Sequence, residues 1–241
     1  MAGLRARRGW LAAVAAVLVL ALAGGGYLLL ARNSDAPAPA SLDAATATTA
    51  TTVGDAAQPE STGTPDGAWR VRDDGSSFVG YRVRERLAQL SSPSEAVGRT
   101  TQVTGTMQVA GDQVEAVRVE ADLRGLQSDE GRRDNAIRQR GLESSRFPTA
   151  VFELAEPIRL DQQPASGRRV SGQGKGRLTV RGITREVTAD LQGRWDGSTI
   201  QVAGRIPVRM SDFQIEPPLV GFVLSIEDSL TVEFRLNFVP A

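Results

Sequence analysis

Apolar and polar residues alternate along eight segments of the chain. Successive side chains of a β-strand point to opposite faces of a sheet, so this pattern predicts strands with one apolar and one polar face. The intervening positions hold mainly Arg, Glu, Asp, Gln and Thr, which indicates that the second face contacts water. We expect strands at about 76–87, 100–110, 113–124, 149–160, 169–181, 184–195, 199–210 and 229–239.

Short turn sequences separate several of these segments. Gly111, Gly182 and Gly197 each lie at the centre of such a turn, and a tight turn makes its two strands antiparallel neighbours. Eight strands with one apolar face form either a sandwich or a barrel. Successive hairpins favour the barrel, so we predict an all-β, eight-stranded antiparallel barrel.

Two longer connections interrupt this regular pattern. Residues 128–142 read as one short helix, in which Ser128 is a candidate cap and Gly141 suits the end. Residues 212–228 form a loop with several apolar residues, Phe213 and Phe222 among them. Long ordered loops usually carry function, so we expect one or both segments to cover the barrel mouth.

The predicted inner face contains many glycines, with Gly172, Gly174 and Gly176 on a single strand. Glycine permits the sharp bends of a curved sheet, which is a structural explanation. It also leaves volume unfilled, and an eight-stranded barrel is large enough to hold one small ligand. The pattern alone leaves both explanations open.

Other inward positions are candidates for contact with a ligand. Large side chains on such a face form either a packed core or the wall of a cavity. The candidate ligand-binding residues are Tyr81, Val83, Met107, Val119, Phe152, Gly174, Leu178, Leu191, Trp195, Ile206, Phe213, Phe222 and Phe234.

An uncharged run at residues 10–31 precedes the strands and is long enough to cross a bilayer as a helix. Arginines within residues 1–9 place that basic segment in the cytoplasm and the rest of the chain outside. A cleavable signal peptide is the alternative, but the apolar run exceeds the usual length of a signal core. We therefore expect an uncleaved signal-anchor, a single-pass location in the cell membrane and an extracytoplasmic C-terminal domain.

Residues 32–66 are rich in Ala, Thr, Pro and Ser, with few large apolar residues. Such a composition predicts a disordered linker. The remaining residues, 67–241, are long enough to form one ordinary domain with its own core.

Composition argues against several classes of function. The chain has no cysteine and no histidine, and its formal net charge is zero. We therefore expect no cofactor, no metal site and no nucleic-acid partner, and the oligomeric state is left open. Asp134, Asp212 and Glu216 are the carboxylates worth considering for catalysis, but structural roles suit them better. An enzyme is the least favoured interpretation.

Four segments resemble the YceI-like domain family, in order and in register with the strands. They are Trp69 with Ser77 and Phe78 at the opening, residues 133–137 (RDNAI) with 146–152 (RFPTAVF), residues 178–187 (LTVRGITREV), and residues 209–213 (RMSDF). Two departures stand out. Many members carry a histidine near Ile137 and Arg138, and many have glycine where this chain has Gln214.

The resemblance implies a lipocalin-like barrel over residues 67–241 that encloses an amphiphilic chain. Members are periplasmic or secreted and bind polyisoprenoids, quinone-like molecules or fatty-acid derivatives, and no catalytic residues carry over. The resulting expectation is a membrane-tethered binding protein for an isoprenoid or other long-chain lipid. The alternative is a barrel without ligand that serves structure or interaction in the cell envelope.

Overall fold

The computed structural model describes residues 36–42, 64–160, 166–221 and 223–241. The expected segments 1–9 and 10–31, and most of the linker 32–66, lie outside the described residues. Within the described part of the chain, no helix is long and apolar enough to cross a membrane. Residues 37–241 belong to one compact unit.

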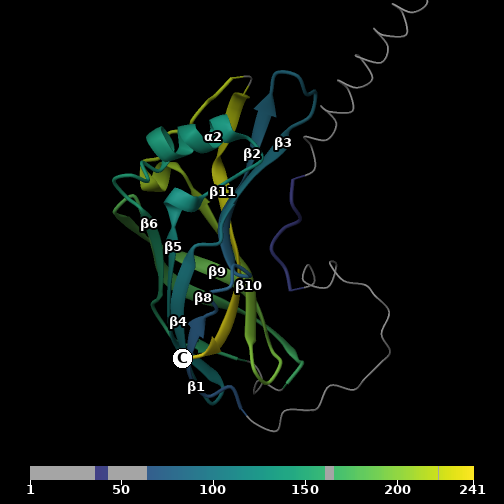
Figure 1. Ribbon diagram of the computed structural model, residues 1–241, viewed down its shortest axis with the longest axis vertical. Coiled ribbons are helices and arrows are strands. Elements are labelled where there is room, and N and C mark those ends of the chain that lie inside the picture. The colour runs from purple at the N-terminus through teal and green to yellow at the C-terminus, as the bar shows by residue number, and fades with distance from the viewer. Residues whose placement is uncertain (1–35, 43–63, 161–165, 222) are drawn as a thin grey trace, which may run out of the picture. The chain divides into compact units, whose positions relative to one another are not determined.

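The described residues of this unit form one antiparallel sheet (Figure 1). Its strands are β1 (Gly67–Val71), β2 (Phe78–Leu87), β3 (Ser94–Thr100), β4 (Val103–Ala110), β5 (Gln113–Asp122), β6 (Thr149–Leu154), β7 (Ile158–Arg159), β8 (Arg169–Val180), β9 (Ile183–Trp195), β10 (Ile200–Arg209) and β11 (Val223–Pro240).

The long strand β11 closes the sheet into a barrel. One of its edges pairs with β10. Its other edge pairs first with β2, from Val223 to Arg235, and then with β1, from Phe238 to Pro240. Because β1 also pairs with β4, the strands β1, β4, β5, β6, β8, β9, β10 and β11 form a closed ring. The predicted eight-stranded antiparallel barrel is therefore confirmed, and the hairpin β2–β3 extends it along β11.

Two strands were not predicted from the sequence. Strand β1 has only five residues, too few for a clear alternation. Strand β3 buries Ala96, Val97, Gly98 and Thr100, so its apolar and polar residues do not alternate in the way that predicts a strand. Gly98 must be small because the ring of Tyr81 lies over it, and an added Cβ would overlap that ring.

The hairpin between β8 and β9 illustrates how local sequence sets the register. Arg181 and Gly182 both adopt positive φ angles, +52° and +72°. Two such residues make the tight turn whose twist matches that of paired strands. Val180 and Ile183 therefore pair directly, and the alternation of both strands places their apolar positions on one face.

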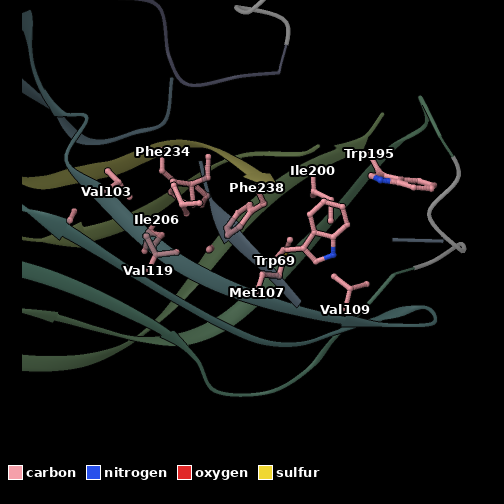
Figure 2. Close-up of a cluster of buried hydrophobic side chains, with 14 residues drawn as sticks. Trp69, Val103, Met107, Val109, Val119, Trp195, Ile200, Ile206, Phe234 and Phe238 are labelled. Carbon is pink, nitrogen blue, oxygen red and sulfur yellow. The ribbon is translucent and has the colours of Figure 1, made fainter. Parts of the chain in front are cut away.

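Buried side chains from around the ring fill one part of the barrel interior. Figure 2 shows Trp69, Met107 and Phe238 among these residues. The indole nitrogen of Trp69 donates a hydrogen bond to the Pro65 carbonyl at 2.8 Å. Pro65 lies before the first strand and lines the cavity described below, so the chain entering β1 contributes to the barrel wall.

A short helix lies across the end of the sheet that bears β2, β3 and β6 (Figure 1). It comprises α2 (Gly131–Ala136) and the π-helical turn η4 (Ile137–Gly141), and its end at Gly141 agrees with the sequence prediction. Its cap differs: Glu130 accepts a hydrogen bond from the Arg132 amide. Ser128 is not the cap because its side chain binds Asp134 instead.

Residues 37–42, a described part of the expected linker, contact the outer face of the barrel. The guanidinium groups of Arg82 and Arg99 donate hydrogen bonds to the carbonyls of Pro37 and Ala38. Both arginines pair with Glu233, which is 2% exposed. Leu42 is 1% exposed. This segment therefore packs on the barrel although its composition predicts disorder.

A candidate ligand cavity with a polar end

The barrel encloses a cavity of about 300 Å³ with a predominantly apolar wall. This volume lies at the lower end of the range for small-molecule sites. Every sequence-predicted ligand residue except Phe222 lines it, and the side chain of Phe222 lies outside the described residues. The lining candidates are Tyr81, Val83, Met107, Val119, Phe152, Gly174, Leu178, Leu191, Trp195, Ile206, Phe213 and Phe234.

The sequence left two explanations for the inward glycines, namely bending of the strands and unfilled volume for a ligand. The structure shows that only some of these glycines face open volume. At Gly176 and Gly204 the rings of Phe152 and Phe234 occupy the space that a side chain would need. At Gly174 an added Cβ would lie 2.9 Å from Ile158 Cδ1, so this position does not face open space. At Gly172 the nearest atom is Ile158 Cγ2 at 3.9 Å. The open volume therefore lies beside Gly172.

Both long connections line the cavity. The helix contributes Ile137 and the adjoining Leu142. The other connection contains the 3-10 turn η5 (Ser211–Phe213), and Phe213 is 2% exposed. Pro218 faces Gly141, where an added Cβ would lie 3.8 Å from Pro218 Cγ. These contacts support the expectation that the two segments cover the barrel mouth.

A charged pair lies at this end of a predominantly apolar cavity, whose lining also includes Arg168, Arg194 and Arg209. Glu85 of β2 and Arg133 of α2 both line it, and they are 3% and 8% exposed. An Arg133 Nη atom donates to Glu85 Oε1 at 2.7 Å, and the other donates to Asp129 Oδ1 at 2.6 Å. The Arg133 guanidinium of the helix therefore pairs with the Glu85 carboxylate, which β2 places on the inner face of the barrel. We call Tyr81, Glu85, Asp129 and Arg133 the polar cluster.

Two oxygen atoms of the polar cluster have no hydrogen-bond partner among the described residues. They are the Tyr81 hydroxyl and Glu85 Oε2. Burial raises the pKa of Glu85, and the charge of Arg133 opposes this rise. Burial also raises the pKa of Tyr81, whose hydroxyl feels the charges of Arg133, Asp134 and Glu85. The charge of Arg133 therefore acts on both residues that carry the unpartnered oxygens.

Sequence reasoning found Tyr81 but missed Glu85 and the pairing of Arg133. A usable signal was present: Tyr81, Val83 and Glu85 share one face of β2 by their two-residue spacing. A carboxylate that continues an apolar face requires a partner or a function. The partner could not be identified from sequence, because Arg133 lies 48 residues away.

Among the carboxylates considered for catalysis, Asp134 makes structural hydrogen bonds. Asp134 accepts hydrogen bonds from the Ser128 amide at 2.9 Å and hydroxyl at 2.6 Å, which agrees with a backbone-binding role. The structural role expected of Asp212 is to cap the turn after β10, but Asp212 does not hold that turn. Asp228 does so, because it binds the Ser211 amide at 2.8 Å and hydroxyl at 2.7 Å.

The closed antiparallel ring, the apolar cavity and the covering helix define a hollow, lipocalin-like β-barrel. The chain belongs to the YceI-like domain family, whose model matches residues 69–238. That match spans nearly all of the barrel, and it confirms the family inferred from the four sequence segments.

Solved structures with the same fold include two bacterial proteins. A polyisoprenoid binding domain from Saccharophagus degradans, implicated in plant cell wall breakdown, is 15% identical with a TM-score of 0.58. The match covers 72% of this chain and 98% of that one. BcnA from Burkholderia cenocepacia is 18% identical with a TM-score of 0.50, and the match covers 67% of this chain and 95% of that one. No curated protein matches the chain significantly.

Proposed function

We propose that this protein is a membrane-tethered, extracytoplasmic binding protein that holds an amphiphilic lipid, isoprenoid or quinone-like, inside its barrel. The observation that carries the proposal is the cavity itself. Its wall is predominantly apolar and it bears a polar cluster at one end, the arrangement that an amphiphile complements. Burial of the tail would supply about 25 cal/mol per Å² of apolar area.

The relatives support the choice of lipid. The Saccharophagus degradans structure is described as a polyisoprenoid binding domain, and its fold is that of this chain. An isoprenoid tail is long, flexible and apolar, so it suits a cavity lined by aliphatic and aromatic side chains.

The sequence supports the location. The uncharged run at residues 10–31 has membrane-spanning length, and arginines precede it. N-terminal sequencing of the mature protein tests this part of the proposal. An intact N-terminus in the membrane fraction supports the anchor, whereas a mature chain that begins near Gly24 overturns it.

A cavity-filling substitution tests the binding function. Gly172→Leu adds a side chain where the cavity is open, so we expect weaker binding of a fluorescent isoprenoid by the folded barrel. Loss of contact with two methylenes alone costs about 1.6 kcal/mol, or roughly tenfold in affinity. Gly131→Leu is the matched control, because Gly131 is exposed and has open space around it. Equal affinities for both variants and the wild type would place the ligand elsewhere.

A further inference from the structure

The polar cluster contains two hydrogen-bonding groups that the described protein leaves unused. Glu85 Oε1 pairs with Arg133, but Glu85 Oε2 has no partner among the described residues. The Tyr81 hydroxyl, also buried, likewise finds none there. Both residues line the cavity, and both lie on the inner face of β2.

Unused polar groups of this kind are costly. A buried donor or acceptor without a partner loses the hydrogen bonds it would make with water, so buried polar groups in native proteins nearly always have a partner. A carboxylate accepts hydrogen bonds only, whereas a phenol both donates and accepts. A ligand group that donates to Glu85 and also bonds with Tyr81 would satisfy both oxygens.

The charges of the polar cluster restrict that ligand group further. Its one cation, Arg133, is already paired with Glu85 and Asp129. Asp134 adds a third carboxylate nearby, which the Tyr81 hydroxyl also feels. A phosphate placed here would meet more negative than positive charge, and like charges repel strongly where water is excluded.

We propose that Tyr81 and Glu85 bind the head group of the lipid, and that this head group is uncharged and carries a hydroxyl. Glu85 Oε2 accepts the hydrogen bond of that hydroxyl, and the Tyr81 hydroxyl bonds with an oxygen of the same head group. An isoprenoid alcohol and a prenylated hydroquinone both have this chemistry. The inference rests on the proposed lipid-binding function and specifies its ligand.

A set of ligands with one tail and different heads tests the inference. Geranylgeraniol, its methyl ether, its monophosphate and a geranylgeranyl hydroquinone should be titrated into the wild-type protein against a fluorescent isoprenoid. We expect the alcohol or the hydroquinone to bind about three- to tenfold more tightly than the ether, the range of one net hydrogen bond. The monophosphate should bind more weakly than the alcohol.

The outcomes separate the inference from the proposed function. Equal affinity for alcohol and ether, or tighter binding of the monophosphate, overturns the inference and leaves lipid binding intact. Failure of all four ligands to bind overturns the lipid-binding function itself. A preference for alcohol over hydroquinone, or the reverse, identifies the source of the hydroxyl.

Two variants assign the effect to these residues. Tyr81→Phe removes only the unpartnered hydroxyl, so the fold should be retained and the preference for alcohol over ether should shrink. Glu85→Gln should likewise retain the fold and reduce the preference for alcohol over ether. Ser94→Ala is the matched control, because it removes another buried hydroxyl without a described partner, away from the cavity lining. If Tyr81→Phe weakens alcohol and ether equally, the head group does not bind at Tyr81.

Discussion

At the level of single residues, Glu85 is a position where packing would favour an apolar side chain but the protein has a carboxylate. A buried ion pair rarely stabilises a fold more than apolar residues of similar size would. Glu85 and Arg133 nevertheless occupy the inner wall of an apolar cavity at 2.7 Å from each other. A ligand that needs a polar contact gives this arrangement a purpose that packing alone does not.

The pH dependence of stability tests the environment of Glu85. Burial raises its pKa above the ordinary value of 4.5, so the folded state binds the proton more tightly than the unfolded state. The stability contributed by Glu85 is full below pH 4.5 and is lost as pH rises through the folded-state pKa. We expect the unfolding free energy of the wild type, relative to Glu85→Gln, to fall between pH 4.5 and neutrality in urea titrations.

Subtraction of the variant cancels the groups that both proteins share, including the aspartates of the turns. A wild-type advantage that grows with pH over this range would mean that the ion pair with Arg133 dominates the effect of burial on Glu85.

At the scale of elements, strict alternation predicted the strands that carry large apolar residues on one face. Strands β2, β4, β5, β8, β9 and β10 lie close to their predicted ranges. Alternation did not reveal β3, because the Tyr81 ring over Gly98 demands small residues there. The sequence pattern shows the size and polarity of each side chain. The small residue at Gly98 is instead explained by the space that the Tyr81 ring of the neighbouring strand occupies.

The two connections over the mouth were predicted from their length and apolar content, but the second is shorter than the predicted 212–228 because β11 begins at Val223. Their contacts were not predicted, since Gly141 and Pro218 are remote in sequence. Gln214 follows η5 with a φ of +53°, a left-handed conformation that favours glycine. The glycine common in the family at this position is therefore explained by backbone geometry.

A charge placed in the mouth tests its role as a lid. Ile215 lines the cavity, whereas Leu219 is 52% exposed and does not. Ile215→Asp should speed release of a bound fluorescent isoprenoid by roughly tenfold or more, because a charge against an apolar tail costs over 1.4 kcal/mol. Leu219→Asp should leave the release rate unchanged. Stopped-flow fluorescence measures the release rate of the isoprenoid from both variants. Equal release rates in the folded fractions would show that this segment is not a lid.

At the scale of the whole molecule, the ordered unit includes part of the sequence that composition assigns to a linker. Residues 37–42 are held by Arg82, Arg99 and Glu233 and by burial of Leu42. Composition predicts disorder when a segment has too little apolar area of its own. A single leucine and a few backbone carbonyls suffice here, because the barrel supplies the partner surface.

Disruption of this contact should release the segment and leave the barrel folded. Leu42→Asp removes burial worth about 1.5–3 kcal/mol, so amide hydrogen exchange in residues 37–42 should accelerate by roughly ten- to a hundredfold. Pro39→Asp places the same charge at an exposed position of the same segment and should change little. Equal exchange in the two variants would mean that Leu42 does not hold the segment.

Native mass spectrometry of the full chain purified from its own host shows whether the barrel carries a lipid. We predict an additional mass that dissociates as a hydroxyl-bearing isoprenoid or related amphiphile, and that is depleted in Gly172→Leu but retained in Gly131→Leu. If the folded wild-type barrel repeatedly shows no additional mass and takes up no isoprenoid when one is supplied, the protein does not carry a lipid. That result would favour an envelope protein that acts through its outer surface.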